Sequence, residues 1–500
     1  MFLSFLHPFS IRNTEAPYLW VFYKQIMHFS SDEICFMGSE NYFLSPAYYQ
    51  AQERWEFRDE CQKSNVYSIP TEQKIGLYQK YIFAKDLFAS LADTYQNCSN
   101  LIWQHLLTKD YPPLSEAIEA IIREVKAKGI DIDAILSWCN TPSLDKIAKK
   151  YNIPVIYNEV GPLRFPFYLS TAYWDRSGVN GNTSAHKRYL RFCEEFKNSS
   201  QPPELLSLQQ LQELFMLRRD GTECETTYSV GVPLQVENDS NVLAYANGFN
   251  NLNLCDTVNG QYAKEDVLIR KHPGGYFLLA DNTFGITDKS PSSLSFIYKC
   301  QTIHTINSSV GLETLLQGRK AVAYGDCPYR FITNLENADE RLLALNFFVF
   351  CYLIPYAMMY DAEYYKWLLQ EQEEIKIFEQ NKAIYKILKE KEDFRQEVTD
   401  LTNQNTDLTN QNKDLNLQIV NLTSQQGKLE NHISQLISET QNLKEQISAI
   451  TNTKGYRALE KMRDIMHYEK KQIVDKILPY GSRRRRLIKK ILLKTFWLIV

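Results

Sequence analysis

Apolar and amphipathic segments alternate along the chain from about residue 114. Short apolar runs predict strands, and apolar residues spaced three or four positions apart predict helices. The alternation of strands and helices favours a parallel sheet. In chain order we predict helix Leu114–Lys128, strand Ala134–Trp138, helix Leu144–Tyr151 and strand Pro154–Asn158, followed by a helix-rich stretch over Pro203–Arg219.

A second series of the same kind follows this stretch. It predicts strands Tyr228–Val236, Asp266–Arg270, Gln301–Ile306 and Lys320–Tyr324, with helix Val310–Leu316 before the last strand. Two successive α/β units indicate two Rossmann-like lobes with a cleft between them. We place the lobes at residues 1–220 and 221–345, and a helical connection at 346–390.

Beyond Tyr360 the chain is rich in Glu, Gln, Lys, Asn and Leu, and an apolar residue recurs at every seventh position. This period predicts a coiled coil over residues 391–452, about 80 Å long from Val398 to Ile450. Polar residues such as Asn405 and Asn412 share the a positions with apolar ones, which fixes the register. We therefore expect a homo-oligomer, either a dimer or a trimer. The d positions are Leu401, Leu408, Leu415, Leu422, Leu429, Leu436, Leu443 and Ile450.

Residues 453–500 are predicted to form a helical tail with a basic end. Seven cations between Arg483 and Lys494 alternate with apolar residues that include Phe496 and Trp497. Such a helix lies in the interface of an anionic membrane rather than crossing it. A nucleic-acid arm and a packing helix are the alternatives.

Net charge, cysteine usage and the N-terminal sequence indicate what the protein binds and where it is found. The 500 residues carry a net charge of only −3, so the globular part is not expected to bind nucleic acid. Ten cysteines without a CxxC pair indicate reduced thiols and no metal site. The N-terminus lacks the features of a secretion signal. We expect a cytoplasmic protein that is peripheral on the inner membrane.

Two acidic residues follow predicted strands, one in each lobe. Glu159 comes after the apolar run PVIYN and Asp239 lies in PLQVENDSN. Carboxylates that face each other across a cleft could serve as acid/base and nucleophile in glycosyl transfer, although both could also be solvated loop residues. Asp131 and Asp133 form a DxD pattern, but we interpret them as turn residues.

Two further segments suit a phosphate. Asn307, Ser308, Ser309 and Gly311 stand where a strand gives way to a helix, whose first turn has unpaired N–H groups, although a serine there could simply cap the helix. Upstream, Arg270, Lys271 and His272 end a predicted strand, where side chains face the ligand crevice. Taken alone, His272 could equally be an ordinary turn residue.

Together and in this order, IYNEVGPLR, PLQVENDSN, RKHPGG and TINSSVGLETLLQGRKAVAYGD resemble segments of the bacterial capsule polysaccharide synthesis proteins. More narrowly, the chain is similar to the retaining β-Kdo transferases of capsule and O-antigen assembly. The resemblance covers about residues 130 to 330. It implies a GT-B-like fold, a CMP-Kdo donor and a glycan acceptor.

The resemblance also implies roles for individual residues. Asp239 would form a covalent adduct with Kdo, and Glu159 would activate the acceptor hydroxyl. His272 and Lys271 would bind the departing CMP phosphate, which needs no divalent metal and no other cofactor. Substrate-binding roles extend to Arg270, Gln235, Asn307, Ser308, Ser309 and Gly311.

Alternatives remain open at this stage. Bacterial sialyltransferases share the HP and serine motifs, so CMP-sialic acid is a second candidate donor, and a non-catalytic scaffold of polysaccharide assembly is a third interpretation. Aromatic residues are frequent in the first 100 positions and could stack on sugars or fill the core. The coil between a catalytic head and a membrane-seeking end could also set the length of the glycan before a terminal Kdo is added.

Overall fold

The computed structural model describes residues 1–218, 225–275 and 279–496. Arg219, at the end of the predicted helix-rich stretch, and Trp497, in the predicted tail, lie outside these ranges. The chain divides into two compact units, Met1–Phe394 and Arg395–Val500. The predicted fold class, a pair of α/β lobes followed by long helices, is confirmed.

The first lobe is built on a seven-stranded sheet with the order β12-β6-β5-β4-β1-β2-β3. The five strands from β5 to β3 run parallel, whereas β6 and β12 are antiparallel to their neighbours. Every residue of β1, β2 and β4 is buried, as in a sheet covered on both faces. The strands are β1 (Phe2–Phe5), β2 (Ile34–Gly38), β3 (Lys80–Ile82), β4 (Ala134–Ser137), β5 (Val155–Val160), β6 (Thr171–Asp175) and β12 (Leu353–Pro355).

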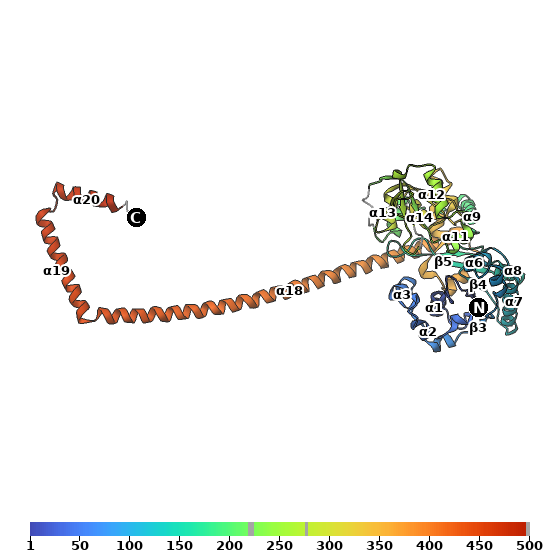
Figure 1. Ribbon diagram of the computed structural model, residues 1–500, viewed down its shortest axis with the longest axis horizontal. Helices are drawn as coiled ribbons and strands as arrows, with labels where there is room; N and C mark the ends of the chain where they lie inside the picture. The colour runs from blue at the N-terminus through green and yellow to red at the C-terminus, as the bar shows by residue number, and fades with distance from the viewer. Residues whose placement is uncertain (219–224, 276–278, 497–500) are drawn as a thin grey trace. The chain divides into compact units, whose positions relative to one another are not determined.

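Helices of the first lobe cover this sheet (Figure 1). Amphipathic α7 and α8 match the predicted helices, with apolar residues such as Ile118 and Ile147 turned inward. The helices are α1 (Leu19–His28), α2 (Pro46–Gln50), α3 (Asp59–Asn65), α4 (Glu72–Gly76), α5 (Ala89–Thr94), α6 (Ser99–Thr108), α7 (Pro112–Ala127), α8 (Pro142–Lys150), α9 (Ala185–Asn198) and α10 (Leu208–Phe215).

The second lobe has an all-parallel five-stranded sheet with the order β11-β10-β7-β8-β9. The four predicted strands and the predicted helix 310–316 are present, the helix with the predicted bounds, whereas a fifth strand and three further helices were not predicted. The strands are β7 (Tyr228–Pro233), β8 (Val267–Arg270), β9 (Ile286–Thr287), β10 (Cys300–Thr305) and β11 (Lys320–Ala323), and the helices are α11 (Ser240–Tyr245), α12 (Asn251–Asn259), α13 (Ser293–Tyr298) and α14 (Val310–Leu316).

After the second lobe the chain returns to the first. Strand β12 pairs with β6, so the stretch predicted as a helical connection also supplies a strand of the first sheet. This returning segment therefore ties the two lobes into one unit. Its helices are α15 (Arg330–Thr333), α16 (Ala338–Phe347) and α17 (Ala362–Leu369).

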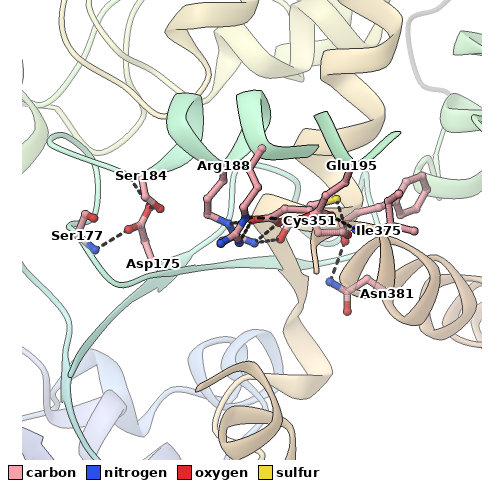
Figure 2. Close-up of polar contacts among 11 residues, drawn as sticks. Asp175, Ser177, Ser184, Arg188, Glu195, Cys351, Ile375 and Asn381 are labelled. Atoms are coloured by element: carbon pink, nitrogen blue, oxygen red, sulfur yellow. Dashed lines mark hydrogen bonds and ion pairs between the residues drawn. The ribbon is translucent and has the colours of Figure 1, made fainter. Parts of the chain in front are cut away.

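A buried ion pair anchors the start of the next helix, α18 (Glu374–Thr451), in the first unit. The fully buried carboxylate of Glu374 accepts from Arg188 Nε at 2.9 Å, and Arg188 Nη2 also donates to the carbonyl of Cys351 at 2.7 Å. Figure 2 shows Arg188 and Glu195 of α9 beside this junction, where Glu195 accepts from the Ile375 amide at 3.0 Å. Breaking such a buried pair costs about 3–5 kcal/mol, so the base of α18 belongs to the folded unit.

The second unit continues α18 and adds α19 (Lys454–Ile477) and α20 (Arg483–Phe496). Helix α18 is continuous over 78 residues, and the apolar residues at its predicted d positions are exposed. Within residues 1–218, 225–275 and 279–496, no helix combines the length and apolar character that crossing a bilayer requires.

Candidate active site

A cavity of about 870 Å³ opens between the lobes and contains both predicted acids. Most of its wall comes from the first lobe, and Asp239 and Ser240 close it from the second. We call it the interlobe cavity. Its wall is formed by residues 11–15, 17, 18, 20, 48, 49, 52 and 54–56, together with Trp103, Trp138, Glu159, Asp239 and Ser240.

Asp239 is held at the start of α11, where its side chain accepts from the Asn241 amide at 3.2 Å. Its other carboxylate oxygen accepts from Arg12 Nη2 at 2.8 Å, and Arg12 Nε donates to the carbonyl of Asn238 at 3.3 Å. Both partners of the ion pair are about 40% exposed, at 41% for Arg12 and 40% for Asp239. Exposed pairs contribute no more than about 1 kcal/mol, so a ligand can displace Arg12.

Glu159 lies near the C-terminal end of β5, paired across the sheet with Tyr173. The strand thus runs beyond the predicted end at Asn158, and Glu159 belongs to it. Its carboxylate accepts from the Val160 amide at 2.8 Å. Burial raises the pKa of Glu159 to about 7; Arg164 and this amide act in the opposite direction, and Asp239 raises it further.

His272 belongs to the same electrostatic neighbourhood. Partial burial lowers the pKa of His272, Asp239 raises it, and the nearby Arg12 and Arg164 lower it. The Nδ1 atom of His272 accepts from the Gly274 amide at 3.0 Å. In the neutral ring, the proton is therefore on Nε2, which leaves that atom as the donor.

The other two residues of the basic segment are engaged within their own lobe. Arg270 Nη1 pairs with the buried Asp288 at 2.5 Å and donates to the carbonyl of Ser290 at 3.0 Å. Lys271 Nζ pairs with Asp281 at 2.7 Å. Neither cation is in the wall of the interlobe cavity.

Gln235 and Asn307 form a buried network beneath Asp239. Gln235 Nε2 donates to Asn307 Oδ1 at 2.9 Å, and Gln235 Oε1 accepts from the Asn307 amide at 3.1 Å. Asn307 Nδ2 in turn donates to the carbonyl of Asn241 at 2.9 Å. The network joins the ends of β7 and β10 to α11, and thereby positions the helix start that holds Asp239.

The serine segment is a tight strand-to-helix turn. Ser308 Oγ accepts from the Val310 amide at 3.3 Å, which is a capping contact, whereas Ser309 makes no side-chain cap. A Cβ atom on Gly311 would lie 2.4 Å from the Tyr329 hydroxyl. Gly311 is therefore needed for the close approach of Tyr329, which donates a hydrogen bond to the carbonyl of Ser308.

Sequence reasoning missed two arginines of this site. Arg12 has a left-handed backbone with φ of 53° in a turn of the first lobe, and no local pattern connects it with Asp239. Arg164 donates to the carbonyl of Gly161 at 2.7 Å and influences the pKa of both Glu159 and His272. Arg164 ends the segment IYNEVGPLR, which could have drawn attention to it. The DxD carboxylate Asp133 pairs with the N-terminal amine at 2.8 Å, and we interpret this contact as structural.

Two Rossmann-type lobes that share a cavity define the fold class of the protein, which is GT-B-like. Residues 4–184 match the family described as the Glycosyltransferase 99 family N-terminal domain. The predicted resemblance to bacterial capsule polysaccharide glycosyltransferases is thereby confirmed for this part of the chain. No match was found among curated proteins.

Matches among solved structures include two transferases and an epimerase. The β-Kdo 2,7-transferase KpsC of Thermosulfurimonas dismutans is 17% identical with a TM-score of 0.36, over 47% of this chain and 81% of that chain. The β-Kdo 2,4-transferase KpsC of the same organism is 15% identical with a TM-score of 0.30, over 43% and 79%. The UDP-GlcNAc 2-epimerase of Neisseria meningitidis is 12% identical with a TM-score of 0.26, over 76% and 94%.

Proposed function

We propose that this chain transfers Kdo from CMP-Kdo to a bacterial surface glycan, of the capsule or O-antigen, with retention of configuration. The observation that carries the proposal is the interlobe cavity, in which Glu159 and Asp239 meet from separate lobes. The motifs that resemble β-Kdo transferases supply the choice of donor.

In the first step, an oxygen of the Asp239 carboxylate attacks the anomeric carbon of Kdo, and the bond to the CMP phosphate breaks. Arg12 is released from its ion pair as the carboxylate becomes an ester. The Nε2 donor of His272 faces the departing phosphate, and Ser309 adds a hydroxyl donor. CMP leaves with one phosphate group, so these donors suffice and a divalent metal is not required.

In the second step, the acceptor hydroxyl attacks the same carbon and displaces Asp239 as a free carboxylate. Glu159 takes the proton of this hydroxyl. A pKa of about 7 suits this role, since a base poised near the working pH is available and still basic. Two successive inversions give net retention.

Intact-mass spectrometry of the full chain tests the proposal. Incubation with CMP-Kdo and no acceptor should give a sugar adduct that is absent in Asp239→Asn and present in Asp256→Asn, a control on the exposed face of α12. An adduct that forms only with CMP-sialic acid would show that CMP-sialic acid, and not CMP-Kdo, is the donor. Failure with both donors would overturn the proposal and favour a non-catalytic scaffold.

We also propose that α18 joins copies of the chain and that its length limits the glycan that receives a terminal Kdo. The support is the unbroken helix with its exposed heptad positions. Deletion of residues 408–421, two heptads, shortens the spacer by about 21 Å and is expected to shorten the product glycans. An unchanged length distribution of the product glycans would contradict the proposed control of glycan length and leave the proposed Kdo transfer unaffected.

A further inference from the structure

The first-lobe wall of the interlobe cavity carries large aromatic side chains with free surface. Trp55 is 49% exposed and Tyr48 45% exposed, and both line the cavity. Trp20, which is half-buried, also lines the cavity, and its ring is edge-on to that of buried Trp138 with 4.9 Å between the ring centroids. We call Trp20, Tyr48 and Trp55 the aromatic wall. Exposed aromatic groups inside a concave site indicate a ligand with apolar surface of its own.

Contacts of Arg54 hold the loop that carries Trp55. Arg54, next to Trp55, donates from Nη2 to the carbonyl of Ala16 at 2.9 Å and forms an ion pair with Glu56 at 2.5 Å. Its guanidinium also lies over the ring of Tyr49, 4.9 Å from the centroid. These contacts tie the loop that carries Trp55 to the loop before α1, so ordering this loop costs little free energy on binding.

The charges on the first-lobe side of the interlobe cavity disfavour an acidic acceptor. The lining has two cations, Arg12 and Arg54, and both are paired with carboxylates of the lining. Two further carboxylates, Glu15 and Glu159, have no ion pair with any described residue. An anionic acceptor beside the aromatic wall would be repelled by Glu15, whereas sugar hydroxyls can donate hydrogen bonds to that carboxylate.

We propose that the aromatic wall is the acceptor subsite and that it binds uncharged sugar rings. The ring faces of such sugars present C–H groups to Trp20 and Trp55, and their hydroxyls bond to the carboxylates. The proposal rests on the proposed function for the role of Glu159, which lies in the same cavity. With such a subsite, the enzyme would add an acidic sugar to a neutral glycan and not to another acidic sugar.

Saturation-transfer NMR on the full chain tests this subsite directly. The neutral probes are trisaccharides of glucose, galactose, mannose and N-acetylglucosamine, and the acidic probes are trigalacturonate and a sialic acid trimer. At least one neutral probe should bind at millimolar concentration. Trp55→Ala should weaken its binding about tenfold, and Trp367→Ala, at a half-buried tryptophan of α17 that lines another hollow, should not.

A charge reversal separates recognition by charge from recognition by shape. Glu15→Lys should allow trigalacturonate to bind, and Glu60→Lys, on exposed α3, should not. The proposal is overturned if only acidic probes bind to the unmodified chain, if no neutral probe binds, or if Trp55→Ala has no effect. Adduct formation with CMP-Kdo needs no acceptor. An adduct in Trp55→Ala would therefore support the proposed function independently of the result of the glycan-binding test.

Discussion

Glu159 and Asp239 enter the interlobe cavity with different electrostatic surroundings. Asp239 has Arg12 as an ion-pair partner at 2.8 Å. Glu159 has no such partner among the described residues, and burial makes its ionised form costly. Two carboxylates in unlike environments can therefore divide the work, one as a nucleophile and one as an acceptor of protons.

The pH dependence of Glu159 follows from its raised pKa. Because the base must be deprotonated, kcat/KM should fall as pH drops below about 7. Glu159→Gln should lower the rate by roughly 10²–10⁴-fold and remove this limb of the profile. Initial rates with CMP-Kdo and a neutral acceptor provide the measurement. An unchanged acid limb in Glu159→Gln would assign the titration to another group.

The raised pKa of Glu159 also makes the free energy of unfolding decrease as pH rises. The folded state favours protonated Glu159, so this contribution is complete below the ordinary pKa of 4.5 and is lost as pH rises through about 7. The Glu159→Gln protein lacks this contribution to the pH dependence of stability, because glutamine does not titrate. Urea unfolding of both proteins at about pH 5 and about pH 8 should show the larger pH dependence in the unmodified chain.

At the scale of elements, the second lobe was the more predictable part. Its strands are short apolar runs, and α14 lies between a serine turn and Gly318, so its bounds could be predicted from sequence. The first 110 residues and β12 were not predicted, because three- to five-residue strands and short aromatic-rich helices give no periodic pattern. Glu159 and Asp239 could be proposed from strand ends, whereas Arg12 reaches Asp239 only through tertiary folding.

The exposed heptad positions of α18 define a test of the proposed coiled coil. Replacing Leu415 and Leu422 with Asn puts polar groups at two d positions and should convert the oligomer to a monomer in analytical ultracentrifugation. Leu417→Asn is the matched control, since Leu417 is 65% exposed but lies outside the a and d positions. Equal sedimentation of all three proteins would contradict assembly through this helix.

At the scale of the whole molecule, the two units differ in structure. Residues 1–394 hold the interlobe cavity, and the side chains described over residues 395–490 form no buried core. In α20 the exposed Leu487 and Ile488 follow a run of four arginines. This combination of apolar and cationic side chains is the basis on which we propose that the tail attaches to an anionic membrane surface.

Vesicle sedimentation tests this attachment. The chain should bind phosphatidylglycerol vesicles, bind poorly to phosphatidylcholine vesicles and dissociate at high salt. Replacing Arg483, Arg484 and Arg486 with Gln should weaken binding roughly 100-fold, at about 1 kcal/mol for each cation. The matched control replaces Lys413, Lys428 and Lys444 of α18. Equal binding to neutral vesicles would contradict the electrostatic account.

The most direct test of the central claim is to locate the transferred sugar by tandem mass spectrometry. In Glu159→Gln the acceptor is not activated, so the intermediate formed from CMP-Kdo should accumulate. The account predicts that the sugar is found on the peptide containing Asp239, as an ester of that side chain. A sugar on any other residue, or glycan product without a modified Asp239 at any time, would contradict it.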